Sequence, residues 1–233
     1  MPKPSAPRTR PLPLGIVIIH EDRDIIVIDK PAGLLTMGTD TDKERTAYFA
    51  LTDYVRKGQA RSRNRVFIVH RLDRETSGVL LFAKNETAKF RLQAQWEETE
   101  KIYLAIVQGK LKEREGIVEN YLGENSAHIV YSTPNPSEGK SARTAYRVVK
   151  ETKEYSVLDV NLLTGRKHQI RVHLAGLGHP IVGDKKYGKP GDKQPRLALH
   201  ARSIQFKHPH SGEQLSFSAP VPAFFKTLAG SMG

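Results

Sequence analysis

The hydrophobic pattern of the chain begins with two short runs of β-branched residues. Residues 16–19 (IVII) and 25–28 (IIVI) are separated by the polar stretch 21–24. Apolar runs of this kind, bounded by polar turns, are typical of buried strands. The segment therefore predicts a β-hairpin, and residues 30–33 (KPAG) break the pattern directly after it.

Helix-like spacing follows at several places. Ala47, Leu51 and Val55 recur at helical spacing, and Ile170 and Leu174 share one face of a predicted helix over 167–176. Asn85 has the residue type of an N-cap, which predicts a helix from there to about residue 96. A last short helix is predicted over 221–228.

Strand-like runs make up most of the remaining pattern. They lie at 66–69, 79–82, 101–107, 116–119, 142–149 and 155–159, with a hairpin formed by 204–206 and 214–217. Strands that outnumber the helices between them predict an α+β fold, with a mixed, mostly antiparallel central β-sheet flanked by helices and loops.

The N-terminal segment 1–14 differs in composition from the rest. It contains five prolines, three basic residues and no acid, which predicts an extended, flexible arm. No internal repeat or clear linker interrupts the sequence after it. We therefore predict one domain over residues 15–233.

The charge of the chain narrows the class of partner. The chain has 37 Lys and Arg against 25 Asp and Glu, a net charge of +12. This excess favours a polyanionic partner such as nucleic acid, and the alternative is that the charge serves only solubility. Cys is absent, which excludes disulfides, thiolate metal sites and Cys nucleophiles. The sequence has neither a secretory signal nor an apolar run that could span a bilayer, so a cytoplasmic protein without membrane contact is expected.

The most informative polar segment is the turn between the strands predicted at 66–69 and 79–82. Asp73 lies on it between Arg71 and Arg74, and two such cations favour an ionised carboxylate that can act as nucleophile or base. Gly78 can permit the backbone geometry of the turn. The alternative is an ordinary surface ion-pair cluster.

Several segments in the same order resemble the RluA-type pseudouridine synthases. The sequence HRLDRETSG at 70–78 resembles the signature of that family, and the other matching segments are KPAG at 30–33, KIYLAIVQG at 101–109, LTGRKHQIRVH at 163–173, 179–188, 199–201 and 219–222. The resemblance extends from about residue 16 to residue 222. It implies the fold of the pseudouridine synthase catalytic domain and an RNA-modifying isomerase.

The resemblance also implies roles for four residues. Asp73 would be the essential carboxylate, Arg71 would displace or hold the flipped nucleotide, and Tyr103 would lie over the target base and assist proton transfer. Arg171 would pair with Asp73 and keep it ionised. Without the resemblance, Tyr103 would be a half-buried sheet residue and Arg171 a solvated helix charge.

The implied reaction needs little besides a carboxylate. It breaks the N1–C1′ bond of uridine, rotates the uracil and joins C5 to C1′, with no redox change, so neither a cofactor nor a metal is expected. The carboxylate can attack the sugar or remove a ribose proton to give a glycal, and both routes stay open. A stacked base must first be extruded from the RNA.

The histidines and lysines do not form a pattern of metal or nucleotide sites. His168 and His173 are five residues apart and His208 and His210 two apart, without a carboxylate to complete a ligand set. Residues 183–186 (GDKK) lack the spacing of a phosphate-binding P-loop.

The basic loop 56–65 is the predicted RNA surface outside the pocket, and its alternative is a disordered, solvated loop. Its cationic members are Arg56, Lys57, Arg61, Arg63 and Arg65. Because about 15 residues precede the first strand, we expect a stand-alone catalytic domain without an S4-type RNA-binding domain. The expected substrate is structured ribosomal or transfer RNA, and the expected state is a monomer.

Two other functions account for part of the pattern. A catalytically silent RNA-binding protein on the same scaffold would explain the charge and the fold. A hydrolase using Asp73 on a glycosidic bond would usually need two carboxylates, and Glu75 is too close in sequence to be a convincing partner.

Overall fold

The computed structural model describes residues 10–38, 42–59 and 61–230. The chain divides into two compact units, Met1–Thr99 with Ser203–Ala219 and Glu100–Arg202 with Pro220–Gly233. The prediction of one domain over 15–233 stays a prediction.

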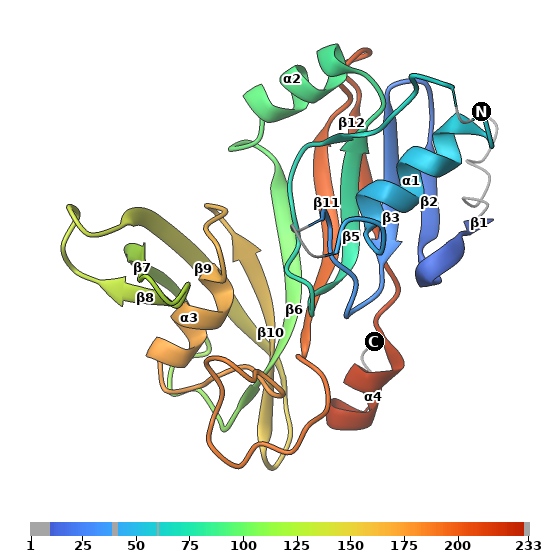
Figure 1. Ribbon diagram of the computed structural model, residues 1–233. Coiled ribbons are helices and arrows are strands. Elements are labelled where there is room, and N and C mark those ends of the chain that lie inside the picture. Colours follow the sequence, from blue (N-terminus) through green and yellow to red (C-terminus); the bar gives the residue numbers. More distant parts are fainter. Residues whose placement is uncertain (1–9, 39–41, 60, 231–233) are drawn as a thin grey trace, which may run out of the picture. The chain divides into compact units, whose positions relative to one another are not determined.

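The first unit is built on strands β2 (Val17–Glu21), β3 (Ile25–Lys30) and β5 (Ser77–Ala83). β2 and β3 form the predicted antiparallel hairpin, and β3 pairs antiparallel with β5, with Ile28 opposite Leu80. Two-residue β4 (Phe67–Ile68) adds to β5, and β12 (Gln214–Ser218) pairs with the end of β11 (Leu199–Lys207) as the predicted C-terminal hairpin. Figure 1 shows β2, β3, β5, β11 and β12 side by side.

β3 and β5 are the central strands of this unit. Both bury successive residues on both faces, which explains why their sequences are continuous apolar runs rather than alternating ones. One face packs into a core that includes Val27, Leu81, Leu92 and Phe206. The apolar runs at 25–28 and 79–82 are therefore correctly predicted strands.

Two helices belong to the first unit, and side chains cap the start of each. α1 (Ala47–Arg56) begins after Thr46, whose hydroxyl accepts a hydrogen bond from the Phe49 N–H at 3.1 Å. α2 (Glu86–Ala94) begins after Asn85, whose side-chain oxygen accepts from the Ala88 N–H at 2.8 Å, so the predicted N-cap is confirmed. α2 packs against β4 and β5.

The second unit contains a run of antiparallel strands in the order β6 (Glu100–Gln108), β10 (Tyr155–Leu162), β9 (Lys140–Glu151), β7 (Glu115–Glu124) and β8 (Val130–Thr133). β8 was not predicted, because it has only four residues and buries only the first and last of them. α3 (Gln169–Gly176) packs against β8 and β9, and α4 (Ala223–Ala229) against β6 and β10.

The predicted fold class is confirmed, since the strand pairings described above are antiparallel and helices flank them. For the predicted N-terminal arm, Arg10–Pro11 form β1 and pair with β2, and Pro13–Gly15 form a 3₁₀ turn. Residues 1–9 of that arm lie outside the described residues. Within the described chain, no helix is both long and apolar enough to cross a membrane.

Candidate active site

The turn that carries Asp73 connects β4 to β5 in the first unit. Asp73 is partly buried, and its carbonyl oxygen accepts a hydrogen bond from the Thr76 N–H at 3.1 Å. Gly78 follows with φ +111°, a backbone conformation that L side chains rarely adopt. Gly78 therefore permits the backbone geometry at the exit of the turn, as predicted.

Lys30 lies at the end of β3, is fully buried, and joins the Asp73 turn to the segment 31–36. Its ammonium donates hydrogen bonds to the carbonyl oxygens of Leu34 at 2.7 Å, Pro31 at 2.9 Å and Arg74 at 3.2 Å. Three carbonyls match the three donors of an ammonium group. Burial lowers the pKa of Lys30 to about 7, against the opposing negative charges of Glu75, Asp73 and Asp29.

Two further contacts tie the same segments together. The Gly33 N–H donates to the Arg74 carbonyl at 2.8 Å. The Thr36 hydroxyl donates to the Leu72 carbonyl at 2.9 Å and accepts from the Leu72 N–H at 3.2 Å. Residues on both sides of Asp73 are thus fixed by backbone-directed hydrogen bonds, which limits the conformations of the turn.

The entrance of the turn is held by His70. Its Nε2 accepts a hydrogen bond from the Leu81 N–H at 3.0 Å, so in the neutral ring the proton lies on Nδ1. The ring stacks against Trp96 with centroids 4.6 Å apart. This anchor connects the residues before Asp73 to β5.

The two arginines that flank Asp73 are both exposed. Arg71 contacts the sulfur of Met37 at 3.9 Å through Nη1, and Arg74 donates from Nε to the Gly33 carbonyl at 3.1 Å. Arg74 also lies 3.8 Å from a Glu75 carboxylate oxygen. An exposed Arg71 is available to a ligand, as its predicted role requires.

Tyr103 lies in β6 of the second unit, opposite Val160 of β10. Its residue is 8% exposed, so it is buried rather than half-buried. Ile102 projects to the other face of the strand because side chains alternate.

Arg171 lies in α3, where it is buried rather than solvated. Its Nε and Nη2 donate to the two carboxylate oxygens of Asp184, at 2.8 and 2.7 Å. This bidentate geometry is the strongest form of an Arg–carboxylate pair. Burial raises the pKa of Asp184, but the hydrogen bonds and charge of Arg171 outweigh it and hold that pKa below its ordinary value.

The loop after α3 positions Asp184. Gly183 has φ +77°, and a Cβ there would lie 1.8 Å from the Arg196 carbonyl oxygen, so the position requires glycine. Asp184 also accepts from the N–H groups of Lys186 and Tyr187, at 2.9 and 3.0 Å. The Arg171 guanidinium lies over the Tyr187 ring, 5.1 Å from its centroid.

Polar side chains also hold α3 to β7 and β9. Gln169 donates to the Arg143 carbonyl at 2.9 Å and to the Thr144 hydroxyl at 2.8 Å. The His173 ring bonds to Thr144 through Nδ1 and to Asn120 through Nε2, both at 2.9 Å. Burial lowers the pKa of His173 to about 4, so the ring is neutral near pH 7.

The predicted RNA surface lies in the first unit. Arg56 ends α1 and donates from Nε to the Asn64 carbonyl at 3.3 Å, while Lys57 takes a left-handed backbone with φ +53°. Arg65 lies over the Phe67 ring and 3.5 Å from Glu86. Lys57, Arg61, Arg63 and Arg65 are exposed.

The predicted site residues therefore occur in both units. Asp73, Arg71 and the basic loop belong to the first unit, and Tyr103 and Arg171 to the second. Lys30 and Asp184 were not among the predicted site residues. The signals were present: a lysine ends an otherwise apolar strand, and an aspartate follows a glycine in a matched segment.

No group of three His, Asp or Glu side chains suited to a metal ion occurs in the ranges that the structure describes.

Comparison with known proteins identifies what this chain resembles. The family model described as RNA pseudouridylate synthase matches residues 24–176. An "Uncharacterized RNA pseudouridine synthase" of Chlorobaculum parvum is 38% identical over 94% of this chain and 75% of its own length. A "Ribosomal large subunit pseudouridine synthase D" of Nitrosomonas europaea is 39% identical over 90% of this chain and 63% of its own length, so the match spans less than two thirds of that relative.

A solved structure gives the same picture. The protein described as "Human RNA Pseudouridylate Synthase Domain Containing 1" has a TM-score of 0.73 and 27% identity, over 98% of this chain and 89% of that one. The similarity therefore extends across both compact units.

Proposed function

Because this chain belongs to the RNA pseudouridylate synthase family and is an isomerase acting on RNA, we propose that Asp73 is its catalytic carboxylate. One observation carries this assignment. Asp73 is the partly buried carboxylate, and Glu75 the exposed one, on a turn that Lys30, Gly33 and Thr36 hold through the backbone groups of Leu72 and Arg74. Such support preorganises a reacting group.

The carboxylate has one of two tasks. It attacks C1′ of the ribose as a nucleophile, or it removes a ribose proton and leaves a glycal. In both routes the N1–C1′ bond breaks and uracil rejoins through C5. Both require an ionised Asp73 and a uridine that has left its stack.

We assign supporting roles to the three other residues. Arg71, which is exposed, holds the displaced nucleotide through its phosphate or base. Tyr103 stacks on the target base and assists proton transfer. Arg171 is assigned, from the family resemblance, the role of pairing with Asp73, and Asp184 holds its guanidinium in a bidentate contact.

We propose structured ribosomal or transfer RNA as the substrate, bound in part by Arg56, Lys57, Arg61, Arg63 and Arg65. The net charge of +12 supports a polyanionic substrate, and the name of the Nitrosomonas relative favours large-subunit ribosomal RNA. A monomeric state and a cytoplasmic location stay predictions from the sequence.

The test uses RNA from a strain that lacks this gene. Pseudouridines are mapped by carbodiimide-dependent primer-extension stops after the wild-type protein, Asp73→Asn or Asp53→Asn has been restored. Asp53 is an exposed aspartate of α1 and serves as the matched control. We expect one site to depend on the gene and to return with wild type and Asp53→Asn only.

The other outcomes are equally informative. If Asp73→Asn restores the site, the assignment of the carboxylate is wrong. If no ribosomal or transfer RNA site depends on the gene and the purified protein also leaves defined RNAs unmodified, this chain is the catalytically silent RNA binder. Free uracil among the products would instead identify a hydrolase.

A further inference from the structure

A cleft in the first unit, separate from the Asp73 turn, has three cationic side chains and one carboxylate among its lining residues. Its volume is about 480 Å³, and Arg23, Lys84, Arg91 and His210 contribute to its walls. One carboxylate, Asp24, also lines it and accepts a hydrogen bond from the Asn85 side chain at 2.8 Å. The walls come from the β2–β3 turn, the start of α2 and the β11–β12 turn.

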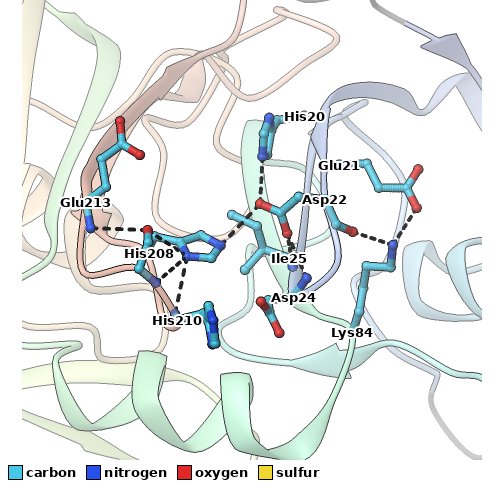
Figure 2. A network of polar contacts seen from close by, with 10 residues as sticks. His20, Glu21, Asp22, Asp24, Ile25, Lys84, His208, His210 and Glu213 are labelled. Atoms are coloured by element: carbon cyan, nitrogen blue, oxygen red, sulfur yellow. Dashed lines mark hydrogen bonds and ion pairs between the residues drawn. The ribbon is translucent and has the colours of Figure 1, made fainter.

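The two turns that form opposite walls are joined by side chains (Figure 2). His208 Nδ1 accepts from the N–H groups of His210 at 3.2 Å and Ser211 at 3.1 Å, so its ring proton lies on Nε2. His208 Nε2 lies 3.2 Å from an Asp22 carboxylate oxygen, which is an ion-pair distance without hydrogen-bond geometry. Asp22 accepts from the Asp24 and Ile25 N–H groups, at 2.7 and 2.8 Å.

The cations differ in how far their charge is already compensated. Lys84 is paired with Glu21 at 2.8 Å. Arg91 donates instead to a neutral group, the Pro209 carbonyl, at 2.9 Å, and Arg23 is exposed on its turn. The contact of Arg91 fixes its guanidinium without neutralising it, so positive charge remains for a ligand.

One residue of the basic loop 56–65 contacts the start of α2, beside the cleft. Arg65 of that loop lies 3.5 Å from Glu86, the first residue of α2, and Thr87 beside it lines the cleft. Glu86 is the acid in the first turn of α2, and Arg65 partly offsets its charge. A negatively charged strand can therefore meet cations from the loop to the cleft.

We propose that this cleft binds a backbone phosphate of the RNA substrate, away from the nucleotide that is modified. Two guanidinium groups favour phosphate because their donor forks match its oxygens. An open, walled cleft of this volume admits a phosphodiester with its flanking riboses. The inference rests on the proposed function in one respect only, namely that the ligand is the RNA that this chain modifies.

The test measures binding of the full chain to unmodified large-subunit ribosomal RNA transcribed in vitro, at several salt concentrations. Arg23→Gln/Arg91→Gln removes the two charges, and Arg23→Lys/Arg91→Lys keeps them. Lys112→Gln/Lys153→Gln removes two charges from exposed positions of the second unit and is the matched control. Thermal unfolding of each variant verifies that it is folded.

We expect Arg23→Gln/Arg91→Gln to weaken binding by about fivefold and to reduce the slope of log K against log salt by about 1 to 2. Arg23→Lys/Arg91→Lys, which keeps both charges, should retain most of the slope. If the Gln pair is unstable, Arg23→Gln alone should lower the slope by about 1, since Arg23 is exposed on a turn.

An unchanged slope and affinity would overturn the proposal, as would an equal loss in Lys112→Gln/Lys153→Gln. Assays of pseudouridine formation by the wild-type protein separate the two ideas. If the wild-type protein forms pseudouridine but Arg23→Gln/Arg91→Gln has the same salt slope as wild type, only the proposal for the cleft is wrong. If the wild-type protein forms no pseudouridine but the salt slope of Arg23→Gln/Arg91→Gln is reduced as expected, the cleft is an RNA-binding site and the proposed function is wrong.

Discussion

Lys30 in the first unit and Arg171 in the second are both buried basic residues, yet their hydrogen-bond partners differ in charge. Lys30 donates only to carbonyl oxygens in its described contacts, those of Pro31, Leu34 and Arg74. Arg171 donates to both oxygens of the Asp184 carboxylate. Lys30 contacts the turn that carries Asp73, and Arg171 has a proposed role of its own.

The difference shows what each partner contributes. Carbonyl dipoles satisfy the donors of Lys30, and burial lowers its pKa to about 7 although the charges of Glu75, Asp73 and Asp29 oppose that shift. A carboxylate supplies a full opposite charge, so the Arg171–Asp184 pair stays ionised. Lys30 therefore acts as a tether between backbone segments, whereas Arg171 holds a permanent charge in a fixed orientation.

Breaking the carboxylate pair should have the largest effect. Asp184→Ala leaves the buried Arg171 charge without this partner, and we expect the free energy of unfolding to fall by about 3–5 kcal/mol in denaturant titrations. Removing both charges in Arg171→Met/Asp184→Leu should cost less. If Asp184→Ala lowers the free energy of unfolding by less than about 1 kcal/mol, Asp184 is not needed to compensate the buried charge of Arg171.

Replacing the tether should have a smaller and pH-dependent effect. Lys30→Met removes one hydrogen bond from each of three carbonyls, of which that of Arg74 keeps its bond from the Gly33 N–H, and we expect the free energy of unfolding to fall by about 1–3 kcal/mol. The folded pKa of about 7 lies below the unfolded value of 10.5, so the unfolded chain binds more protons between them and wild-type stability rises with pH across that window. Met does not titrate, so the gap between the two proteins should widen from about pH 7 to about pH 9.

Lys207→Met is the control for this comparison. Lys207 is exposed in the same unit, so its replacement should change stability by no more than about 0.5 kcal/mol at either pH. If the difference in free energy of unfolding between wild type and Lys30→Met stays constant with pH, folding does not lower the pKa of Lys30.

The smallest expected effect concerns His173, which is buried and neutral. Its folded pKa of about 4 lies below the unfolded value of 6.5, so the unfolded chain binds more protons between them and stability falls as the pH drops through that window. His173→Gln should remove this part of the acid sensitivity. Unfolding titrations at about pH 7 and about pH 5 measure it, and equal pH dependence in both proteins would refute the idea.

Local patterns in the sequence predicted most of the fold. The apolar runs at 25–28 and 79–82 became β3 and β5, and Asn85 became the N-cap of α2. These features depend on side-chain alternation and capping within a few residues. β8, with four residues, was missed because its strand conformation depends on pairing with β7.

The contacts that support the site were not predictable in the same way. Lys30 meets the Arg74 carbonyl across 44 residues of sequence, and Arg171 meets Asp184 across 13. Neither partner is marked by periodicity, since the carbonyl belongs to the backbone and the aspartate to a loop. The cleft beside α2 likewise combines residues 23, 91 and 210 from three separate segments.

The sequence alone determined the fold class, the family, the reaction class and the position of the candidate carboxylate in HRLDRETSG, because these follow from local patterns and matched segments. Only the tertiary structure decided that Lys30 is a buried tether and that Asp184 is a partner of Arg171. The physical reason is that burial and counterion pairing depend on packing between segments distant along the chain, and these determine the charge state of each group.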